Sequence, residues 1–203
     1  MKAIPKRELA ILTFVTLDGV MQAPGQPEED FSGDFKHGGW ATPHWGEVME
    51  QVKVEAMAEP YDLLLGRKTY EIFAPFFSAA GDDNSEAVLL NKATKYVATN
   101  TMRDLDWNNS TPIAGNIATE VARLKAQEGP LLQVHGSWQL IQTLLASDLI
   151  DELRLWTFPV IVGSGKRLFG QNTTQRELTL VKSRATSNGV LMGIYRRDGS
   201  PRS

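Results

Sequence analysis

The sequence contains no cysteine, so disulfides, thiolate metal ligands and cysteine nucleophiles are all excluded. Histidine is scarce, and the three that occur, His37, His44 and His135, have no metal-binding spacing such as HExxH. A zinc-deaminase signature, which needs cysteine ligands, is absent for the same reason. We therefore expect no metal site in this chain.

Long apolar segments and a charge imbalance are also lacking. No segment approaches the 18 or so apolar residues of a membrane span, and the first apolar run continues into Asp18-Gly19 without a signal-peptide cleavage site. The chain has 21 basic and 24 acidic residues, a net charge of -3 and no basic stripe. We expect a cytoplasmic protein that binds neither membrane nor nucleic acid, although local cations could hold a small anionic ligand.

The length and composition favour one globular domain. The chain has 203 residues, of which 42% are hydrophobic and 22% charged, and no linker divides it. We place the domain at residues 1–198 and expect the polar tail, 199–203, to be disordered.

Residues 131–149 contain the most informative pattern. A buried strand at 131–134 is followed by Gly136-Ser137 and then by a helix with Trp138 and Ile141 on its apolar face. Such a helix presents unpaired N–H groups and the positive end of its dipole at one point, which suits a phosphate. The alternative is that Ser137 only caps a packing helix.

A similar unit lies upstream. The strand Tyr61–Leu65 is followed by Gly66 and by a helix start that carries Arg67, Lys68 and Thr69. Two cations and a hydroxyl at a helix start also suit a phosphate, although the alternative is a surface cap with exposed cations.

The standard nucleotide-binding motifs do not fit. A Walker A loop ending at Lys166 would need glycine at Val160 and a hydroxyl residue at Arg167, and a GxGxxG motif at Gly163 would need glycine at Leu168. The two strand-turn-helix units remain, together with a strand end at 99–100. Because the carboxyl ends of parallel strands share one edge, a phosphorylated dinucleotide could contact all three.

The remaining pattern predicts an α/β fold with a mixed, mostly parallel sheet flanked by helices and closed by a C-terminal antiparallel hairpin. Helices are expected from the Thr42-Pro43 cap to Pro60, from Asn84 or Ser85, and from the Asn116 cap. Further strands are expected at 9–17, 95–98, 152–162 (with Pro159 at an edge or bulge), 177–186 and 190–196.

The long loop at 24–41 leads into the first helix between two tryptophans. Trp40 and Trp45 either anchor this loop to the core or form an aromatic wall for a ring-shaped substrate. On the strand at 152–162, Trp156 and Phe158 could also bury a partner surface.

Five motifs in order resemble the dihydrofolate reductase-like superfamily, in the branch related to the C-terminal reductase domain of bacterial riboflavin biosynthesis. They cover nearly the whole chain: VTLDGVMQAP, DLLLGRKTYE, YVATN, VHGSWQLIQTLL and DELRLWTFPVIVGSGKRLF. The resemblance implies a mixed eight-stranded sheet, NADPH as the cofactor and a homodimer. The absence of a deaminase signature leaves only a stand-alone reductase.

The resemblance also implies positions for NADPH. Arg67 would meet the 2′-phosphate, and the family's second pyrophosphate-turn glycine is replaced by Ser137, whose Cβ restricts how closely a phosphate approaches. The implied cofactor-binding residues are Thr16, Leu17, Asp18 and Gly19 beside the nicotinamide, Gly66, Arg67, Lys68, Thr69, Thr99 and Asn100 at the adenosine end, and Gly136, Ser137, Trp138 and Gln139 at the pyrophosphate.

The expected function is an NADPH-dependent reductase of a small heterocyclic (pteridine- or pyrimidine-like) or carbonyl substrate, with the loop at 24–45 closing the pocket. Asp18 and Glu50 are the candidate catalytic carboxylates. Asp18 in an Asp-Gly turn can instead be structural, and Glu47 and Glu50 can be solvated. The alternative function is a non-catalytic nucleotide-binding protein of the same fold.

Overall fold

An eight-stranded sheet forms the centre of the computed structural model, which describes residues 7–56, 58–81, 83–170 and 173–197. The expected tail at 199–203 lies outside these ranges. The strand order is β4-β3-β2-β5-β1-β6-β8-β7. The strands are β1 (Leu9–Thr16), β2 (Tyr61–Gly66), β3 (Lys95–Ala98), β4 (Ser110–Ile113), β5 (Leu131–His135), β6 (Glu152–Phe158), β7 (Leu178–Ala185) and β8 (Leu191–Arg197).

The sheet is mixed in the way the sequence predicts. All neighbouring pairs from β4 to β6 are parallel, whereas β8 runs antiparallel to both β6 and β7. The apolar run of β1 lies in the middle of the sheet and is buried except at Phe14, which is half-buried. The predicted α/β class, the parallel core and the C-terminal hairpin are confirmed.

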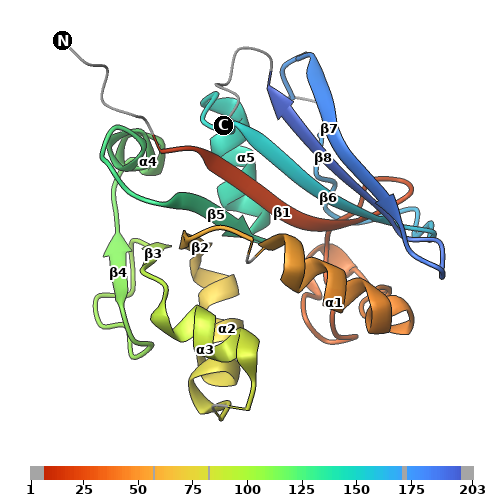
Figure 1. Ribbon diagram of the computed structural model, residues 1–203, viewed down its shortest axis with the longest axis horizontal. Coiled ribbons are helices and arrows are strands. Elements are labelled where there is room, and N and C mark those ends of the chain that lie inside the picture. The colour runs from red at the N-terminus through yellow and green to blue at the C-terminus, as the bar shows by residue number, and fades with distance from the viewer. Residues whose placement is uncertain (1–6, 57, 82, 171–172, 198–203) are drawn as a thin grey trace.

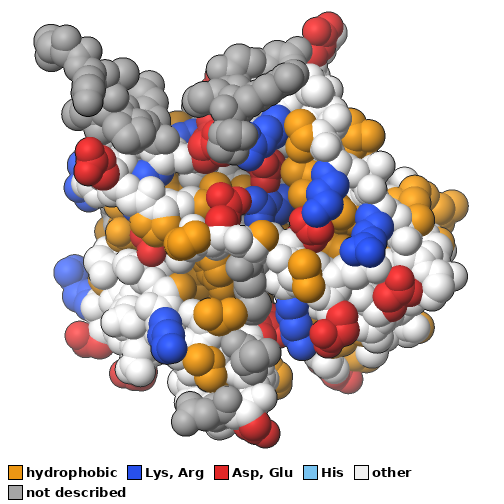
Figure 2. Space-filling view, in the orientation of Figure 1, with side chains coloured by type: hydrophobic (Ala, Val, Ile, Leu, Met, Phe, Trp, Pro, Cys, Tyr) orange, Lys and Arg blue, Asp and Glu red, His pale blue; other side chains and the backbone are white. Residues whose placement is uncertain are grey.

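In the described part of the chain, five α-helices cover the two faces of the sheet (Figure 1). The helices α1 (Trp45–Ala56), α2 (Arg67–Ala79) and α3 (Ser85–Lys92) lie on one face, and α4 (Ile117–Lys125) and α5 (Trp138–Ala146) lie on the other. On the face of α1 to α3, acidic and basic side chains are interspersed (Figure 2). Within the described ranges, no helix is both long and apolar enough to cross a bilayer.

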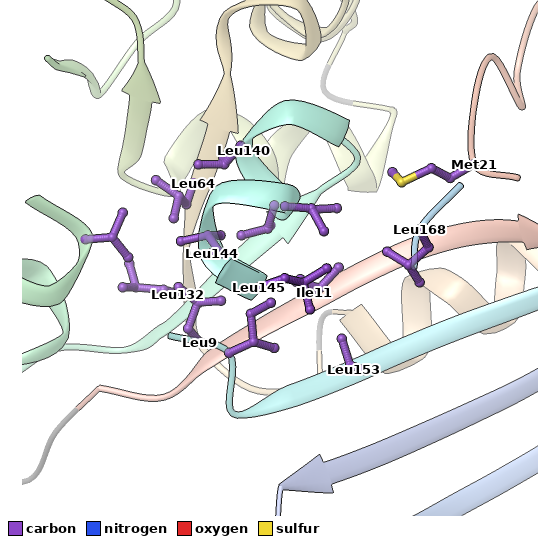
Figure 3. Close-up of a cluster of buried hydrophobic side chains, with 14 of the residues drawn as sticks. Leu9, Ile11, Met21, Leu64, Leu132, Leu140, Leu144, Leu145, Leu153 and Leu168 are labelled. Atoms are coloured by element: carbon purple, nitrogen blue, oxygen red, sulfur yellow. The ribbon is translucent and has the colours of Figure 1, made fainter. Parts of the chain in front are cut away.

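The apolar stripe of α5 packs against the sheet. Leu140 and Leu144 are buried against β1, β2 and β5, together with Leu64 and Leu132 (Figure 3), and Ile141 belongs to the same buried cluster. Burying each side chain of this kind contributes about 1.5–3 kcal/mol. This packing fixes the position of the α5 N-terminus relative to β5.

The other face places α1 over the strands β1 and β6. Val48 and Val52 of α1 pack in the same cluster as Trp156 and Phe158, both of which have no exposed surface. The prediction that these two aromatic residues bury a partner surface is therefore wrong, because they are covered by the chain's own helix and loop.

One strand was missed and two predicted boundaries were wrong, and prolines or a hydroxyl explain these differences. The strand β4 was missed because Pro112 interrupts its pattern, which the edge of the sheet tolerates. The strand β6 ends at Phe158, since Pro159 has no N–H for the ladder. Thr42 begins a separate 3-10 turn (Thr42–His44) and its hydroxyl donates to Gly25 O, so it does not cap α1.

Candidate functional site

The turns after β2 and β5 meet at the carboxyl edge of the sheet. Gly66 N donates to Ser137 Oγ at 2.8 Å, across 71 residues of sequence, and Ser137 Oγ donates to Thr69 Oγ1 at 2.7 Å. A Cβ on Gly66 would lie 3.0 Å from the Cβ and Oγ of Ser137, which is tighter than ordinary packing, so this contact favours glycine at 66. Two separate sequence motifs thus form one hydrogen-bonded unit.

The hydrogen bonds of this unit have a fixed direction. A backbone N–H can only donate, so Ser137 Oγ accepts from Gly66 N, and its own proton is directed to Thr69 Oγ1. Thr69 is half-buried, and its remaining proton has no acceptor among the described residues. The unit therefore ends in a hydroxyl donor, which suits an anionic ligand.

Neither α2 nor α5 has a side-chain cap at its N-terminus. Ser137 has a left-handed conformation (φ 66°, ψ 67°) that turns its hydroxyl toward Gly66, so the alternative that it caps its own helix is wrong. The helices α3 and α4 differ, because Asn84 accepts from Ala87 N and Asn116 accepts from Thr119 N. The first amides of α2 and α5 are left for another partner.

Two cations stand at the start of α2. Arg67 is exposed, and one of its nitrogens donates to Glu71 Oε1 at 2.8 Å. Lys68 is 64% exposed and lies 3.9 Å from Asp30 Oδ1 of the 24–41 loop. Burial opposes ionisation of Asp30, but hydrogen bonds from Lys166 and Ser32 outweigh it and lower the pKa of Asp30 to about 2. The ionised loop carboxylate therefore faces Lys68 at the α2 start.

The turn after β1 is held by Asp18. Its Oδ1 accepts from Thr16 Oγ1 at 2.6 Å, and its Oδ2 accepts from Gly163 N at 2.9 Å, with Arg167 beside it. These hydrogen bonds outweigh the effect of burial and lower the pKa of Asp18. Leu17 is 59% exposed at the same turn. Asp18 thus joins the loop after β1 to the loop after β6. This is the structural role that the sequence analysis gave as the alternative to a catalytic one.

Other implied cofactor residues lie along the same edge. The buried hydroxyl of Thr99 accepts from the amides of residues 101 and 102, and Asn100 Oδ1 accepts from Gly115 N at 2.8 Å. Trp138 Nε1 donates to the carbonyl of residue 167, whereas Gln139 is exposed. The structure brings 66–69 and 136–137 into contact and places 99–100 at the end of β3, one strand beyond β2.

The two tryptophans differ in their surroundings. Trp40 is buried, donates from Nε1 to Gln22 O at 2.8 Å and packs edge-on against Phe158, so it anchors the loop. Trp45 is half-buried, and its Nε1 is buried without a hydrogen-bond partner in the described part of the chain. Of the two, Trp45 is the one whose polar atom is left unsatisfied.

Glu47 and Glu50 of α1 are both exposed residues. The side chain of Glu50 is 76% exposed and pairs with Lys53 at 3.4 Å. Glu47 accepts from the amide and hydroxyl of Ser187 in the turn between β7 and β8. Within the described ranges, no cluster of three or more His, Asp or Glu side chains could hold a metal ion.

One polar pair in the core escaped the sequence prediction. His135, the last residue of β5, places Nε2 2.6 Å from Gln133 Oε1. Burial lowers the pKa of His135 to about 4, with a smaller contribution from Arg154. The sequence signal was available, since polar residues two apart on an apolar strand share one face.

Comparisons with known proteins find relatives of this chain. A family model described as RibD C-terminal domain matches residues 7–192. Uncharacterized protein YyaP of Bacillus subtilis (strain 168) is 32% identical over 140 residues, which are 68% of this chain and 74% of YyaP. Uncharacterized protein YwjB of the same organism is 27% identical over 137 residues, 66% of this chain and 72% of YwjB.

Two solved structures share the fold. A protein from Shewanella sp. PV-4 named for riboflavin biosynthesis matches with a TM-score of 0.62 at 20% identity, over 95% of this chain and 99% of that one. Dihydrofolate reductase from Enterococcus faecalis, complexed with NADP(H) and RAB-propyl, matches with a TM-score of 0.61 at 14% identity. The match covers 94% of this chain and 96% of that one. The fold is dihydrofolate reductase-like, and the chain belongs to the RibD C-terminal domain family.

Proposed function

We propose that this protein is an NADPH-dependent reductase of a small heterocyclic or carbonyl substrate. The observation that carries the proposal is the hydrogen-bonded unit of Gly66, Ser137 and Thr69 between two uncapped helix starts. Paired helix N-termini with adjacent cations suit a ligand with separated phosphates. Membership of the RibD C-terminal domain family supports the same function.

The residues present fit the cofactor. Arg67 would bind the 2′-phosphate through the guanidinium nitrogens that Glu71 does not use, and Thr69 would donate its free proton to a phosphate oxygen. The first amides of α5, from Trp138, would hold the pyrophosphate, with Lys68 and the Thr99-Asn100 strand end beside the adenosine. The side chain of Ser137 packs against Gly66, so its hydroxyl is already used within the site.

NADPH would supply the hydride, and the chain would orient the two reactants and exclude water. The turn at 16–19 would lie beside the nicotinamide, and the loop at 24–45 would cover the pocket. The lowered pKa of Asp18 keeps it ionised at neutral pH, so it would position the turn and not donate a proton. Glu50 is exposed, and we propose that the proton comes from solvent.

A nucleotide titration tests this function. We expect NADPH to bind more tightly than NADH, and Arg67→Ala to weaken NADPH binding by about 1.5–3 kcal/mol, the range for a hydrogen bond to a charged group. NADH binding should not change. Fluorescence transfer from the five tryptophans reports the binding.

Arg123→Ala is the matched control, because Arg123 is also an exposed arginine paired with a glutamate of its own helix but lies on α4. It should leave both affinities unchanged. Failure to bind either nucleotide would contradict the cofactor assignment. Tight NADPH binding without oxidation across a substrate panel would favour the non-catalytic alternative.

We also propose that the protein forms a homodimer through the β7 edge of the sheet. Every residue of β7 is exposed, and the exposed apolar side chains there include Leu180 and Val181, with Leu191 on the neighbouring strand. Unpaired, apolar sheet edges favour association. Light scattering should give a dimer mass for the wild type and a monomer mass for Val181→Lys. A wild-type monomer would contradict this.

A further inference from the structure

The strand β5 has two polar side chains on the face that α1 and α2 cover. Gln133 is fully buried and donates from Nε2 to Ala56 O, at the end of α1, at 2.9 Å. This contact fixes the amide orientation, so Gln133 Oε1 faces His135 Nε2 at 2.6 Å. An amide oxygen can only accept, so Nε2 of His135 must hold the proton.

The tautomer determines what the other ring nitrogen can do. With the proton on Nε2, Nδ1 of the neutral ring has a lone pair and is a hydrogen-bond acceptor. Burial lowers the pKa of His135 to about 4, so the ring stays neutral at physiological pH. His135 therefore cannot act as a proton donor there through Nδ1.

Nδ1 is the ring nitrogen without a partner. It makes no hydrogen bond to the described residues, and it is not one of the fully buried unpaired atoms, which include Tyr61 Oη and Trp156 Nε1. The residue keeps part of its surface exposed. Its ring is stacked on Tyr61, with 6.4 Å between centroids, and meets Phe73 edge-on at 6.5 Å. The acceptor is thus held in a fixed orientation.

The position of His135 connects this acceptor to the proposed cofactor site. It directly precedes the Gly136-Ser137 turn, and its backbone pairs with Leu12 of β1, the strand whose end would lie beside the nicotinamide. Its side chain lies on the face of α1 and α2, where hydrophobic side chains reach the surface near β2 and α2 (Figure 2). An apolar surrounding strengthens a single well-placed polar contact.

We propose that His135 is a specificity-determining residue whose Nδ1 accepts a hydrogen bond from a ring N–H or hydroxyl of the substrate. The inference rests on the proposed function and narrows its substrate class. It selects heterocycles that present a donor at this point, and it disfavours substrates that present only a carbonyl oxygen, because two lone pairs would then face each other.

A pair of pteridines tests the inference. Lumazine has ring N–H donors at N1 and N3, whereas 1,3-dimethyllumazine has methyl groups in place of both. In the presence of NADPH, wild type should bind lumazine about tenfold more tightly, as one buried hydrogen bond implies. His135→Leu should abolish this preference, and His135→Asn, whose Oδ1 can replace Nδ1, should restore most of it.

Nitrogen NMR of the histidine rings separates a binding role from a structural one. If His135 only supported the fold, the pteridines would not shift its Nδ1 resonance. We expect His135 to be the Nε2–H tautomer from pH 5 to 8, and lumazine to shift the Nδ1 resonance while dimethyllumazine does not. An Nδ1–H tautomer, equal binding of the two pteridines by wild type, binding of neither, or a preference that survives His135→Leu would overturn the proposal. NADPH affinity, measured separately in each variant, reports the cofactor function on its own.

Discussion

Two pairs of helices begin in different ways in this molecule. The helices α3 and α4 begin with Asn84 and Asn116, whose side chains accept from amides of the first turn. The helices α2 and α5 begin with Gly66 and Ser137 and have no side-chain cap. The uncapped pair follows the adjacent parallel strands β2 and β5, so both starts lie at one carboxyl edge.

We propose that this difference separates the helix starts that stabilise the fold from those that bind a ligand. A capped helix has satisfied its amides within the chain, which contributes about 1 kcal/mol. An uncapped start forgoes that contribution and keeps its amides and dipole available to a ligand. The hydroxyl of Ser137 ties the two uncapped starts together without occupying the amides of its own helix.

The largest expected effect comes from the ligand itself. NADPH at about one hundred times its dissociation constant should raise the free energy of unfolding by about 2.7 kcal/mol in wild type. Asn84→Ala and Asn116→Ala should keep this increment, because their helix starts take no part in binding, whereas Arg67→Ala should lose most of it at the same NADPH concentration. Chemical denaturation with and without NADPH measures this increase in the free energy of unfolding. Loss of the increase in Asn84→Ala or Asn116→Ala would contradict the distinction between capped and uncapped helix starts.

Substitution of Ser137 should cause the next largest change in the free energy of unfolding. Ser137→Ala leaves Gly66 N–H without its partner and retains a left-handed residue, so we expect a loss of about 2 kcal/mol of stability. Ser137→Gly loses the same hydrogen bonds but relieves about 1 kcal/mol of backbone strain, so about 1 kcal/mol should be lost. Urea denaturation compares the two variants. Equal losses of stability would show that the left-handed backbone at residue 137 is not strained.

Removal of a helix cap should lower stability by less than Ser137→Ala does, and it should not change NADPH affinity. Asn116→Ala should lower the free energy of unfolding by about 1 kcal/mol. Its NADPH dissociation constant should equal that of wild type, since Asn116 belongs to α4. Thermal unfolding and the nucleotide titration together check both statements, and a weaker NADPH affinity would mean that capped helices also serve the site.

The smallest effect on stability is expected for Arg67→Ala. Its contact to Glu71 is an exposed ion pair one turn apart on α2, worth about 0.3–0.5 kcal/mol. The variant should therefore unfold almost as wild type does while its NADPH affinity falls. A loss of stability above about 1 kcal/mol would show that Arg67 supports the fold and not only a ligand.

Much of this arrangement could be predicted from local sequence. Gly66 and Gly136 each follow a short apolar run and precede a helical period, so both turns and their shared edge were correctly placed. The cap at Asn116 and the hairpin at 187–189 were also confirmed. These features depend on residues near one another in the chain.

The features that were missed depend on distant contacts. The hydroxyl of Ser137 has a role only because Gly66 lies beside it after folding, which no local pattern records. The tautomer of His135 depends on Gln133, whose orientation is set by the carbonyl of Ala56, 77 residues away. Trp156 was assigned to an interface because the sequence does not say that α1 covers it.

The central claim is that the two uncapped helix starts bind one ligand together. An NMR titration of the labelled protein with NADPH tests it most directly, because the backbone amides of the 66–69 and 136–139 turns are observed separately. We predict that both groups of resonances shift along the same binding curve, while the first-turn amides of α3 and α4 do not move. Shifts confined to one turn, or to neither, would contradict the claim.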